Sequence, residues 1–248
     1  TLDEAEKSML ELYIDRADIK NGHEILDLGC GWGSFSLYVA EKYPDTKITS
    51  VSNSSDQIAY IKNEAQQRGL SNIKAYRMDV NSLELDAQFD RIVSIEMFEH
   101  LRNYKLILNS LNNLLKPDGR LFIHIFCHKK LTYFYEMKNN FDWMTKYFFQ
   151  GGIMPSKDIF EYFNNDLEII NQWDINGNHY SKTCKAWLNN HYKNKRRILK
   201  IFQNHYDKPK IWFNRWRIFF LSCEAFFALN NGKEYFVSHY LLKKKSDR

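Results

Sequence analysis

An α/β fold built on a doubly wound, mostly parallel sheet of seven strands is predicted by three features of the sequence. First, short apolar stretches alternate with helical patterns along the first half of the chain, as in successive strand–helix units. Second, a glycine-rich turn follows the first of these strands. Third, a polar cluster follows each strand, at the edge of a parallel sheet where such folds bind their ligands.

The elements of the first half follow from apolar spacing and from capping residues. Residues 2–17 have apolar side chains at helical spacing, and Thr1 with Glu4 is typical of a capping box at the start of that helix. Further helices are predicted at 34–42, 56–68 and 104–115, the last of them ended by Pro117 and Gly119. Short strands are predicted between the helices, at 24–26, 47–51, 72–77, 89–95 and 120–126.

The second half departs from this alternation at 127–166, which we interpret as an aromatic-rich helical insertion that covers the ends of the sheet. Its aromatic residues include Tyr133, Phe134, Tyr135, Phe141, Trp143, Tyr147, Phe148 and Phe149. Residues 167–175 and 235–242 are predicted to form the last two strands, and 180–202 and 212–229 to be mostly helical. We therefore expect a single domain over 1–248, with its core sheet in about 22–126 and 167–243.

The composition excludes several classes of protein. Hydrophobic residues make up 44% of the chain, which is typical of a folded protein, and no apolar run approaches the ~20 residues of a membrane helix. The four cysteines are scattered without a C-x-x-C pair, so neither a metal site nor a disulfide framework is expected. This cysteine usage and the lack of a signal peptide predict a cytoplasmic protein.

The net charge of +5 comes largely from basic clusters at 193–200 and 243–248. Solvated faces explain such clusters in most proteins, and the alternative is a weak peripheral contact with an anionic membrane surface. The sequence has no recognised nucleic-acid-binding module, so nucleic acid is not an expected partner. The sequence leaves both a monomer and a homodimer open.

The glycine-rich turn, Asp27-Leu28-Gly29-Cys30-Gly31-Trp32-Gly33, lies between the first strand and the next helix. This geometry brings backbone N–H groups and the positive end of a helix to the sheet edge, where glycines let a ligand approach closely. The spacing is G-x-G-x-G, not the G-x-G-x-x-G of dinucleotide enzymes. It resembles motif I of the Rossmann-like class I S-adenosylmethionine (SAM) methyltransferases. The resemblance implies that SAM is the cofactor and that its methionine part is held by Asp27, Gly29, Gly31 and Gly33.

Residues after the next three strands are candidates for the rest of the cofactor. Many methyltransferases carry an acid after the second strand that binds both ribose hydroxyls, whereas this chain has a hydroxyl and amides there, which make weaker, neutral hydrogen bonds. The acid after the third strand can accept from the adenine amino group, and the valine beside it can pack on the ring. These candidate cofactor-binding residues are Ser52, Asn53, Gln57, Asp79, Val80 and Ile95.

Longer motifs narrow the resemblance. The stretches at 52–57, 96–100, 151–156 and 179–180 are similar to the cyclopropane-fatty-acid synthase superfamily. Within it, 124–129, 142–149 and 178–183 resemble the coclaurine N-methyltransferase-like branch, which methylates benzylisoquinoline-type amines. The resemblance covers nearly the whole chain. Relatives carry a further helical segment before the stretch that matches Thr1, which helps to close the active site, and this sequence does not contain it.

Glu96, Glu99 and His100, which follow the fourth strand, are the candidate catalytic residues. A typical alkylamine is protonated at neutral pH, yet it must attack a methyl group as the free base. Paired carboxylates attract the ammonium form, and a histidine that titrates near neutrality can take up the proton. By resemblance, these three residues match the acidic and basic residues of the coclaurine branch, so a small aromatic amine is the expected substrate. The aromatic insertion would supply rings for cation–π contact.

Two other functions remain open at this stage. Cyclopropane synthases methylate an alkene of a phospholipid acyl chain and use bound bicarbonate as the base. By resemblance, that ion would be held by Glu99, His124, the backbone of Phe126 and Tyr180, with a cysteine that would precede Thr1. The third hypothesis is a SAM-binding domain without activity. The similarity along the whole chain and the additional acid at Glu96 favour the amine.

Overall fold

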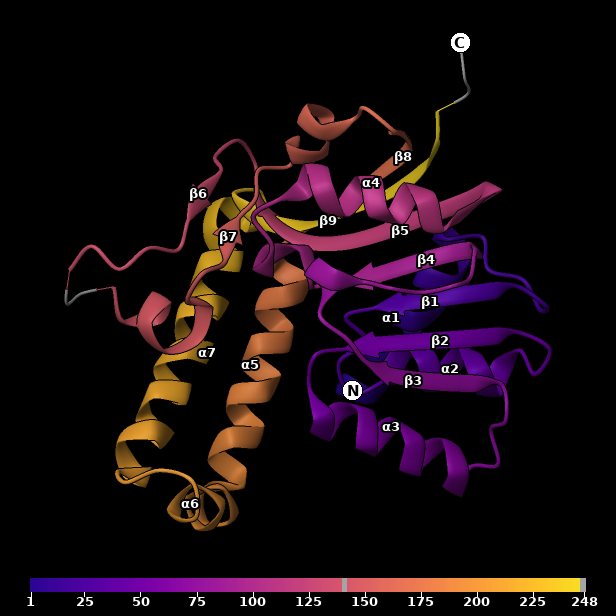
Figure 1. Ribbon diagram of the computed structural model, residues 1–248. Helices are drawn as coiled ribbons and strands as arrows, with labels where there is room; N and C mark the ends of the chain where they lie inside the picture. The colour runs from indigo at the N-terminus through magenta and orange to yellow at the C-terminus, as the bar shows by residue number, and fades with distance from the viewer. Residues whose placement is uncertain (140–141, 246–248) are drawn as a thin grey trace.

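The computed structural model describes residues 1–139 and 142–245, and its centre is a seven-stranded sheet with helices on both faces (Figure 1). The strand order is β3-β2-β1-β4-β5-β9-β8. β9 runs antiparallel to both of its neighbours, whereas the pairs among β1 to β5 are parallel. The strands are β1 (Glu24–Leu28), β2 (Lys47–Ser52), β3 (Ile73–Arg77), β4 (Phe89–Ile95), β5 (Leu115–His128), β8 (Leu167–Ile175) and β9 (Tyr235–Lys244). The predicted fold class is confirmed.

The helices pack on the sheet through apolar stripes. On one face α1 and α2 bury residues such as Tyr13 and Phe35, and on the other α4 buries Tyr104 and Leu111. Thr1 and Glu4 form the predicted capping box. The helices are α1 (Leu2–Arg16), α2 (Ser34–Lys42), α3 (Ser55–Gln67), α4 (Tyr104–Leu114), α5 (Asn178–Lys193), α6 (Lys195–Gln203) and α7 (Pro209–Gly232).

Strand β5 begins at Leu115, before the predicted turn at Pro117 and Gly119. The pairing of β4 with β5 shifts register between Phe89 and Arg91, so the extra residues form an irregularity inside the ladder. Gly119 fits there because a Cβ would lie 2.9 Å from the carbonyl oxygens of Lys116 and Phe89. The turn residues therefore mark a bulge in the strand and not its start.

The insertion at 127–166 contains helical turns, as expected, at η3 (Thr145–Phe149) and η4 (Ile159–Phe163). It also contains a short two-stranded ladder that the sequence did not predict, between β6 (Tyr133–Phe134) and β7 (Ile153–Met154). Phe141 lies outside the described residues. The inner rings of this insertion stack towards the sheet, because Phe149 contacts both Phe126 at the end of β5 and Tyr135.

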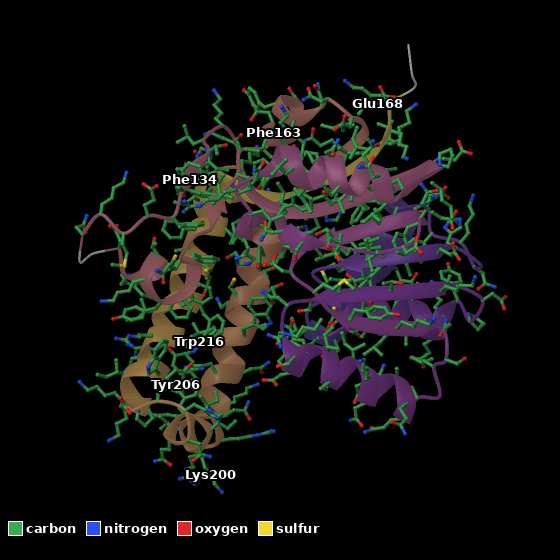
Figure 2. The ribbon with its side chains drawn as sticks, viewed as in Figure 1. Phe134, Phe163, Glu168, Lys200, Tyr206 and Trp216 are labelled. Atoms are coloured by element: carbon green, nitrogen blue, oxygen red, sulfur yellow. The ribbon has the colours of Figure 1, made fainter. Side chains whose placement is uncertain are left out.

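Helices α5 and α7 form a long hairpin that projects beside the sheet, with α6 at its far tip (Figure 1). The predicted helix at 180–202 is interrupted at Asn194, where α5 ends and α6 begins. The basic cluster at 193–200 occupies this tip, and Lys200 lies at its end (Figure 2). Residues 246–248 of the second basic cluster lie outside the described residues. Within the described part of the chain, no helix combines the length and apolar character needed to cross a membrane.

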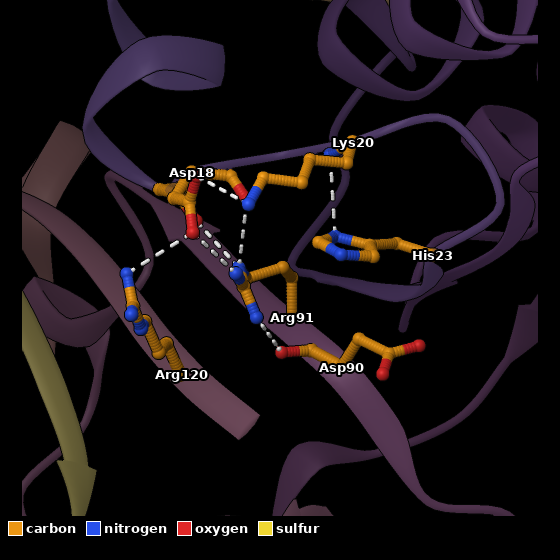
Figure 3. A network of polar contacts seen from close by, with 7 residues as sticks. Asp18, Lys20, His23, Asp90, Arg91 and Arg120 are labelled. Carbon is orange, nitrogen blue, oxygen red and sulfur yellow. Dashed lines mark hydrogen bonds and ion pairs between the residues drawn. The ribbon is translucent and has the colours of Figure 1, made fainter. Parts of the chain in front are cut away.

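A polar network joins the end of α1 to β4 and β5, on the side of the sheet away from the carboxyl ends of these strands (Figure 3). Asp18 accepts from the guanidinium groups of Arg91 at 2.9 Å and Arg120 at 3.2 Å. Arg91 also donates to the carbonyl oxygen of Ala17 at 2.6 Å. Because these strands carry the candidate catalytic residues at their opposite ends, we interpret the network as structural. It fixes α1 against β4 and β5.

Candidate active site

The glycine turn has the backbone conformation that the sequence predicted. Gly29, Gly31 and Gly33 have φ values of 80°, 53° and 82°, in the left-handed region. A Cβ on Gly29 would lie 2.5 Å from Met97 Cγ, and one on Gly33 would lie 2.7 Å from Ile61 Cγ1. A Cβ on Gly31 would meet nothing within 4 Å. Packing therefore explains two of the glycines, whereas the third presents bare backbone to open space that a ligand can enter.

Asp27 lies at the base of this turn and is buried. Its Oδ2 accepts a hydrogen bond from Ser36 Oγ at 2.5 Å, and Ser36 in turn is bonded to Ser50 at 2.6 Å. Burial raises the pKa of Asp27 to about 7, even though the bonds from Ser36 lower it. This carboxyl therefore responds strongly to a nearby positive charge.

The predicted ribose and adenine residues lie at the ends of β2 and β3. Ser52 is buried and donates to Gln57 Oε1 at 2.6 Å, so these two side chains hold one another. Asn53 is exposed. Asp79 is exposed as well and uses Oδ1 to cap the short helix η1 (Val80–Ser82), accepting from Asn81 N–H at 2.9 Å. The residues gather at one edge, and Asp79 has a structural role as the cap of η1, while its contact with adenine stays a prediction.

Glu96 follows β4 with a φ of 50°, a conformation that glutamate rarely adopts. Its Oε2 accepts from Tyr180 Oη at 3.0 Å, and its Oε1 lies 3.4 Å from His124 Nε2. Burial opposes ionisation of Glu96, yet the contacts with His124 and Tyr180 and the charge of His100 outweigh it, and its pKa is lowered. Glu96 is therefore a carboxylate that accepts one hydrogen bond from Tyr180 and lies beside His124, with 36% of its side chain exposed.

Glu99 lies in the next turn, η2 (Phe98–His100), and is 1% exposed. Its Oε1 accepts from Phe126 N–H at 2.8 Å, and its Oε2 is a buried atom without a hydrogen-bond partner. Burial, followed by the charge of Glu96, raises the pKa of Glu99 well above the usual value. The two neighbouring carboxyl groups therefore have opposite tendencies, one ionised and one neutral.

The other predicted site residues differ in burial and in their contacts with Glu96 and Glu99. His100 is exposed, and it acts on Glu96 through its charge. Ile95 is half-buried and pairs in register with His124 across β4 and β5. Phe126 and Tyr180 join an aromatic wall with Phe227, whose ring centroid lies 4.3 Å from that of Tyr180. The structure thus brings Glu96, Glu99, His124, Phe126 and Tyr180 together and leaves His100 at the rim.

Sequence reasoning missed three polar residues behind His124. Tyr13 Oη lies 2.8 Å from His124 Nδ1, and His239 Nε2 lies 3.0 Å from the same atom. Arg16 Nη1 donates to His239 Nδ1 at 2.8 Å. The only sequence signal was a histidine inside each of two apolar strands, and neither strand reveals its partner by itself.

The sheet order, the glycine turn between β1 and α2, and the polar cluster at the carboxyl ends of the strands define a class I SAM-dependent methyltransferase. Residues 1–235 match the family model described as mycolic acid cyclopropane synthetase. The chain belongs to this family, which confirms the superfamily to which the sequence motifs pointed.

Individual relatives give finer comparisons. The chain is 42% identical to (S)-coclaurine N-methyltransferase of Thalictrum flavum subsp. glaucum, over 99% of this chain and 70% of the relative. A crystal structure of coclaurine N-methyltransferase bound to N-methylheliamine and SAH superimposes with a TM-score of 0.94 at 40% identity, covering 98% of this chain and 73% of that one. Cyclopropane-fatty-acyl-phospholipid synthase of Escherichia coli K12 is 31% identical over 75% of this chain and 46% of its own length. The similarity to the coclaurine branch is therefore higher and more extensive.

Proposed function

We propose that this chain transfers a methyl group from SAM to the nitrogen of a small aromatic amine of the benzylisoquinoline type. The similarity to (S)-coclaurine N-methyltransferase over nearly the whole chain supports this substrate class. The observation that carries the proposal is the pair of carboxyl groups whose pKa values are displaced in opposite directions, Glu96 downward and Glu99 upward. Such pairs separate an electrostatic role from a proton-transfer role.

The cofactor would lie along the carboxyl edge of β1 to β4. SAM supplies a methyl group on a sulfonium. Gly31 leaves open space beside bare backbone, and the buried Asp27 can become a carboxylate next to the amino group of the methionine part. Ser52 and Gln57 already hold each other at the end of β2 and can offer neutral hydrogen bonds to the ribose. The remaining residues assigned to this role are Gly29, Gly33, Asn53, Asp79, Val80 and Ile95.

The amine would enter as an ammonium ion, drawn by the ionised Glu96. Its charge next to the buried Glu99 would favour release of the Glu99 proton to solvent, which leaves a carboxylate that can accept the proton of the ammonium. Passing the proton to Glu99 produces a neutral acid, the form that burial favours, and leaves a free amine to attack the methyl group. His100, exposed at the rim, is placed to exchange that proton with water.

The bicarbonate alternative needs three donors, two of which already bond a carboxyl group while the third lies beside one. Tyr180 donates to Glu96, and His124 Nε2 faces Glu96 at 3.4 Å. Phe126 N–H donates to Glu99. An anion in this position would compete with both carboxyl groups for Tyr180 and Phe126 and would lie beside the negative charge of Glu96, which favours a cationic ligand over bicarbonate.

We also infer that the chain works as one domain. The core sheet would carry the cofactor, and the 127–166 insertion would cover the acceptor side. Close packing of the insertion against η2 supports this, because a Cβ on Gly152 would lie 3.0 Å from the carbonyl oxygen of Glu99.

The test is a methyl-transfer assay with labelled SAM and two kinds of acceptor. One arm contains tetrahydroisoquinolines and simpler arylalkylamines, and the other contains vesicles of unsaturated phospholipid. Label in the amine fraction is the expected result. Label in the lipid fraction would contradict the proposal and assign Glu99, His124 and Tyr180 to lipid chemistry. If neither acceptor is labelled although calorimetry detects SAM binding, the domain binds the cofactor without this activity.

A further inference from the structure

A continuous line of polar side chains runs from α1 through the sheet to Glu96. We call this line the relay; it consists of Arg16, His239, His124 and Glu96. His124 on β5 and His239 on β9 are register partners in the antiparallel ladder, and both are buried, at 6% and 1% exposed. His239 Nε2 lies 3.0 Å from His124 Nδ1, and the two rings are tilted by 36° with centroids 4.8 Å apart. A hydrogen bond at this distance requires that one of these two nitrogens carries the proton and the other does not.

Arg16 decides which nitrogen carries it. The guanidinium has only donors and remains charged, and its Nη1 lies 2.8 Å from His239 Nδ1. His239 Nδ1 must therefore be the unprotonated acceptor. Burial, followed by the positive charge of neighbours such as Arg16, lowers the pKa of His239, so this ring is neutral and holds its single proton on Nε2. That proton is the one donated to His124 Nδ1.

Tyr13 adds a second donor at the same place. Its hydroxyl lies 2.8 Å from His124 Nδ1, and burial raises the pKa of Tyr13 well above the usual value, so the hydroxyl keeps its proton. Because His239 Nε2–H donates to Nδ1, that nitrogen is unprotonated and the neutral His124 carries its proton on Nε2; the Tyr13 hydroxyl shares the single lone pair of Nδ1. That nitrogen has no hydrogen-bond partner of standard geometry and lies 3.4 Å from Glu96 Oε1.

We propose that Arg16 is a positioning residue that, through His239, fixes His124 as an Nε2–H donor and thereby keeps Glu96 an oriented carboxylate acceptor for the cationic amine. The assignment of the protons rests on the donor geometry around the two rings, supported by the directions of the pKa shifts of His239 and Tyr13, whereas the effect on the amine rests on the proposed function. Arg16 does not touch the reacting atoms. The nearest atoms of the relay to the substrate are those of Glu96, which Tyr180 holds from its other oxygen.

The surroundings of the relay support a fixed arrangement. Trp173, the register partner of His239 on β8, covers the guanidinium of Arg16, whose carbon lies 4.9 Å from the ring centroid. Phe122 packs edge-on to His239. At the Glu96 end of the relay, the charged or titratable neighbours include His100 and Glu99 from η2 and Tyr180 from α5. The Arg16 end is therefore the one from which a permanent positive charge orders the protons.

The first measurement is the protonation pattern of the histidines in the full chain, by long-range ¹H–¹⁵N correlation with ¹⁵N-histidine. We expect both His124 and His239 as Nε2–H tautomers, with His239→Gln used to assign the signals. In Arg16→Met, which has no donor, His239 should lose its single tautomer and His124 should change with it. Arg16→Lys, which keeps an obligate donor, should restore the pattern. An Nδ1–H tautomer of His124 or His239 in the unmodified chain would overturn the proposal. An unchanged pattern of these two residues in Arg16→Met would overturn it as well.

The second measurement separates positioning from folding. Arg16→Met should raise KM for the amine about tenfold, as for other residues that orient a ligand-binding group, with kcat and the Kd for SAM nearly unchanged. Arg16→Lys should recover most of the loss. Arg120→Met removes a comparably placed arginine that bonds Asp18 and faces no histidine, so its KM should stay near that of the unmodified enzyme. Equal KM values in Arg16→Met and Arg120→Met would count against the proposal. If no amine is methylated at all, the proposed function fails while the tautomers still decide this inference.

Discussion

The proposed active site has two halves, a cofactor half around Asp27 and Ser52 and an acceptor half around Glu96 and Glu99, and they are built in different ways. In the cofactor half, the two side-chain hydrogen bonds of Asp27 and Gln57 join residues that are close in sequence: Ser36 to Asp27 over 9 positions, Ser52 to Gln57 over 5. In the acceptor half, Tyr180 reaches Glu96 over 84 positions and Arg16 reaches His239 over 223. A turn and the helix after it can therefore specify the first half, whereas the second exists only once β5, β9, α1 and α5 have assembled.

The same contrast applies to charge. Asp27 and Glu99 are both buried with few donors, and the pKa of each is raised. Glu96, which contacts Tyr180 and His124 from distant parts of the chain, has a lowered pKa. The long-range contacts thus give the acceptor half a permanent negative charge next to a neutral acid, which a local motif does not produce.

The largest effect is expected in the cofactor half, from Gly31→Val. At a φ of 53° a β-branched residue is strained, and its side chain would occupy the open space beside the turn. We expect no measurable SAM binding by calorimetry. Gly69→Val is the matched control, because Gly69 also has a positive φ of 67° and open space around it but follows α3, away from the site. Normal SAM affinity in Gly31→Val would refute the placement of the cofactor.

In the acceptor half, Glu99→Gln should lower kcat at least about a hundredfold, the usual contribution of a proton-transfer group. The amide oxygen can still accept from Phe126 N–H, so the fold and the Kd for SAM should be preserved. Glu99→Ala and His100→Ala should also abolish turnover with SAM binding nearly unchanged. Loss of SAM binding in step with turnover would mean that the two halves are not separate.

This division explains what the sequence could predict. The strands, the glycine turn and the placement of Glu96 and Glu99 after β4 follow from local patterns and from the family motifs. The bulge at Gly119 and the break at Asn194 were missed, because the first depends on pairing with β4 and the second interrupts an otherwise helical stretch. The relay behind His124 could not be predicted, since it requires the register of β5 with β9. The roles of the individual site residues remain predictions.

The pH dependence of unfolding in Asp27→Asn tests whether burial raises the pKa of Asp27 in the cofactor half. The folded-state pKa of Asp27 is about 7 and its usual value is 3.8, so the folded protein binds a proton that the unfolded chain releases. The free energy of unfolding of the unmodified protein, relative to Asp27→Asn, should therefore fall by about 2 kcal/mol as the pH rises from ~5 to ~7. Denaturant unfolding at several pH values measures this difference. Parallel pH curves would show that Asp27 is already ionised in the folded protein, and SAM should then leave the curves parallel too.

The smallest effect, and the one that most sharpens the comparison, is expected from Glu96→Gln. The amide keeps the shape of the side chain but loses the charge that His124 and Tyr180 maintain, so KM for a cationic amine should rise about tenfold while kcat changes little. Glu234→Gln is the control, because Glu234 also pairs with a histidine of β5, His128, at 3.0 Å, but is not part of the acceptor cluster. A neutral analogue of the amine distinguishes an effect of charge from an effect of shape. Its affinity should be the same for the unmodified enzyme and for Glu96→Gln. If the analogue weakens as much as the amine, Glu96 acts through packing, and the long-range donors would then have no electrostatic role in the acceptor half.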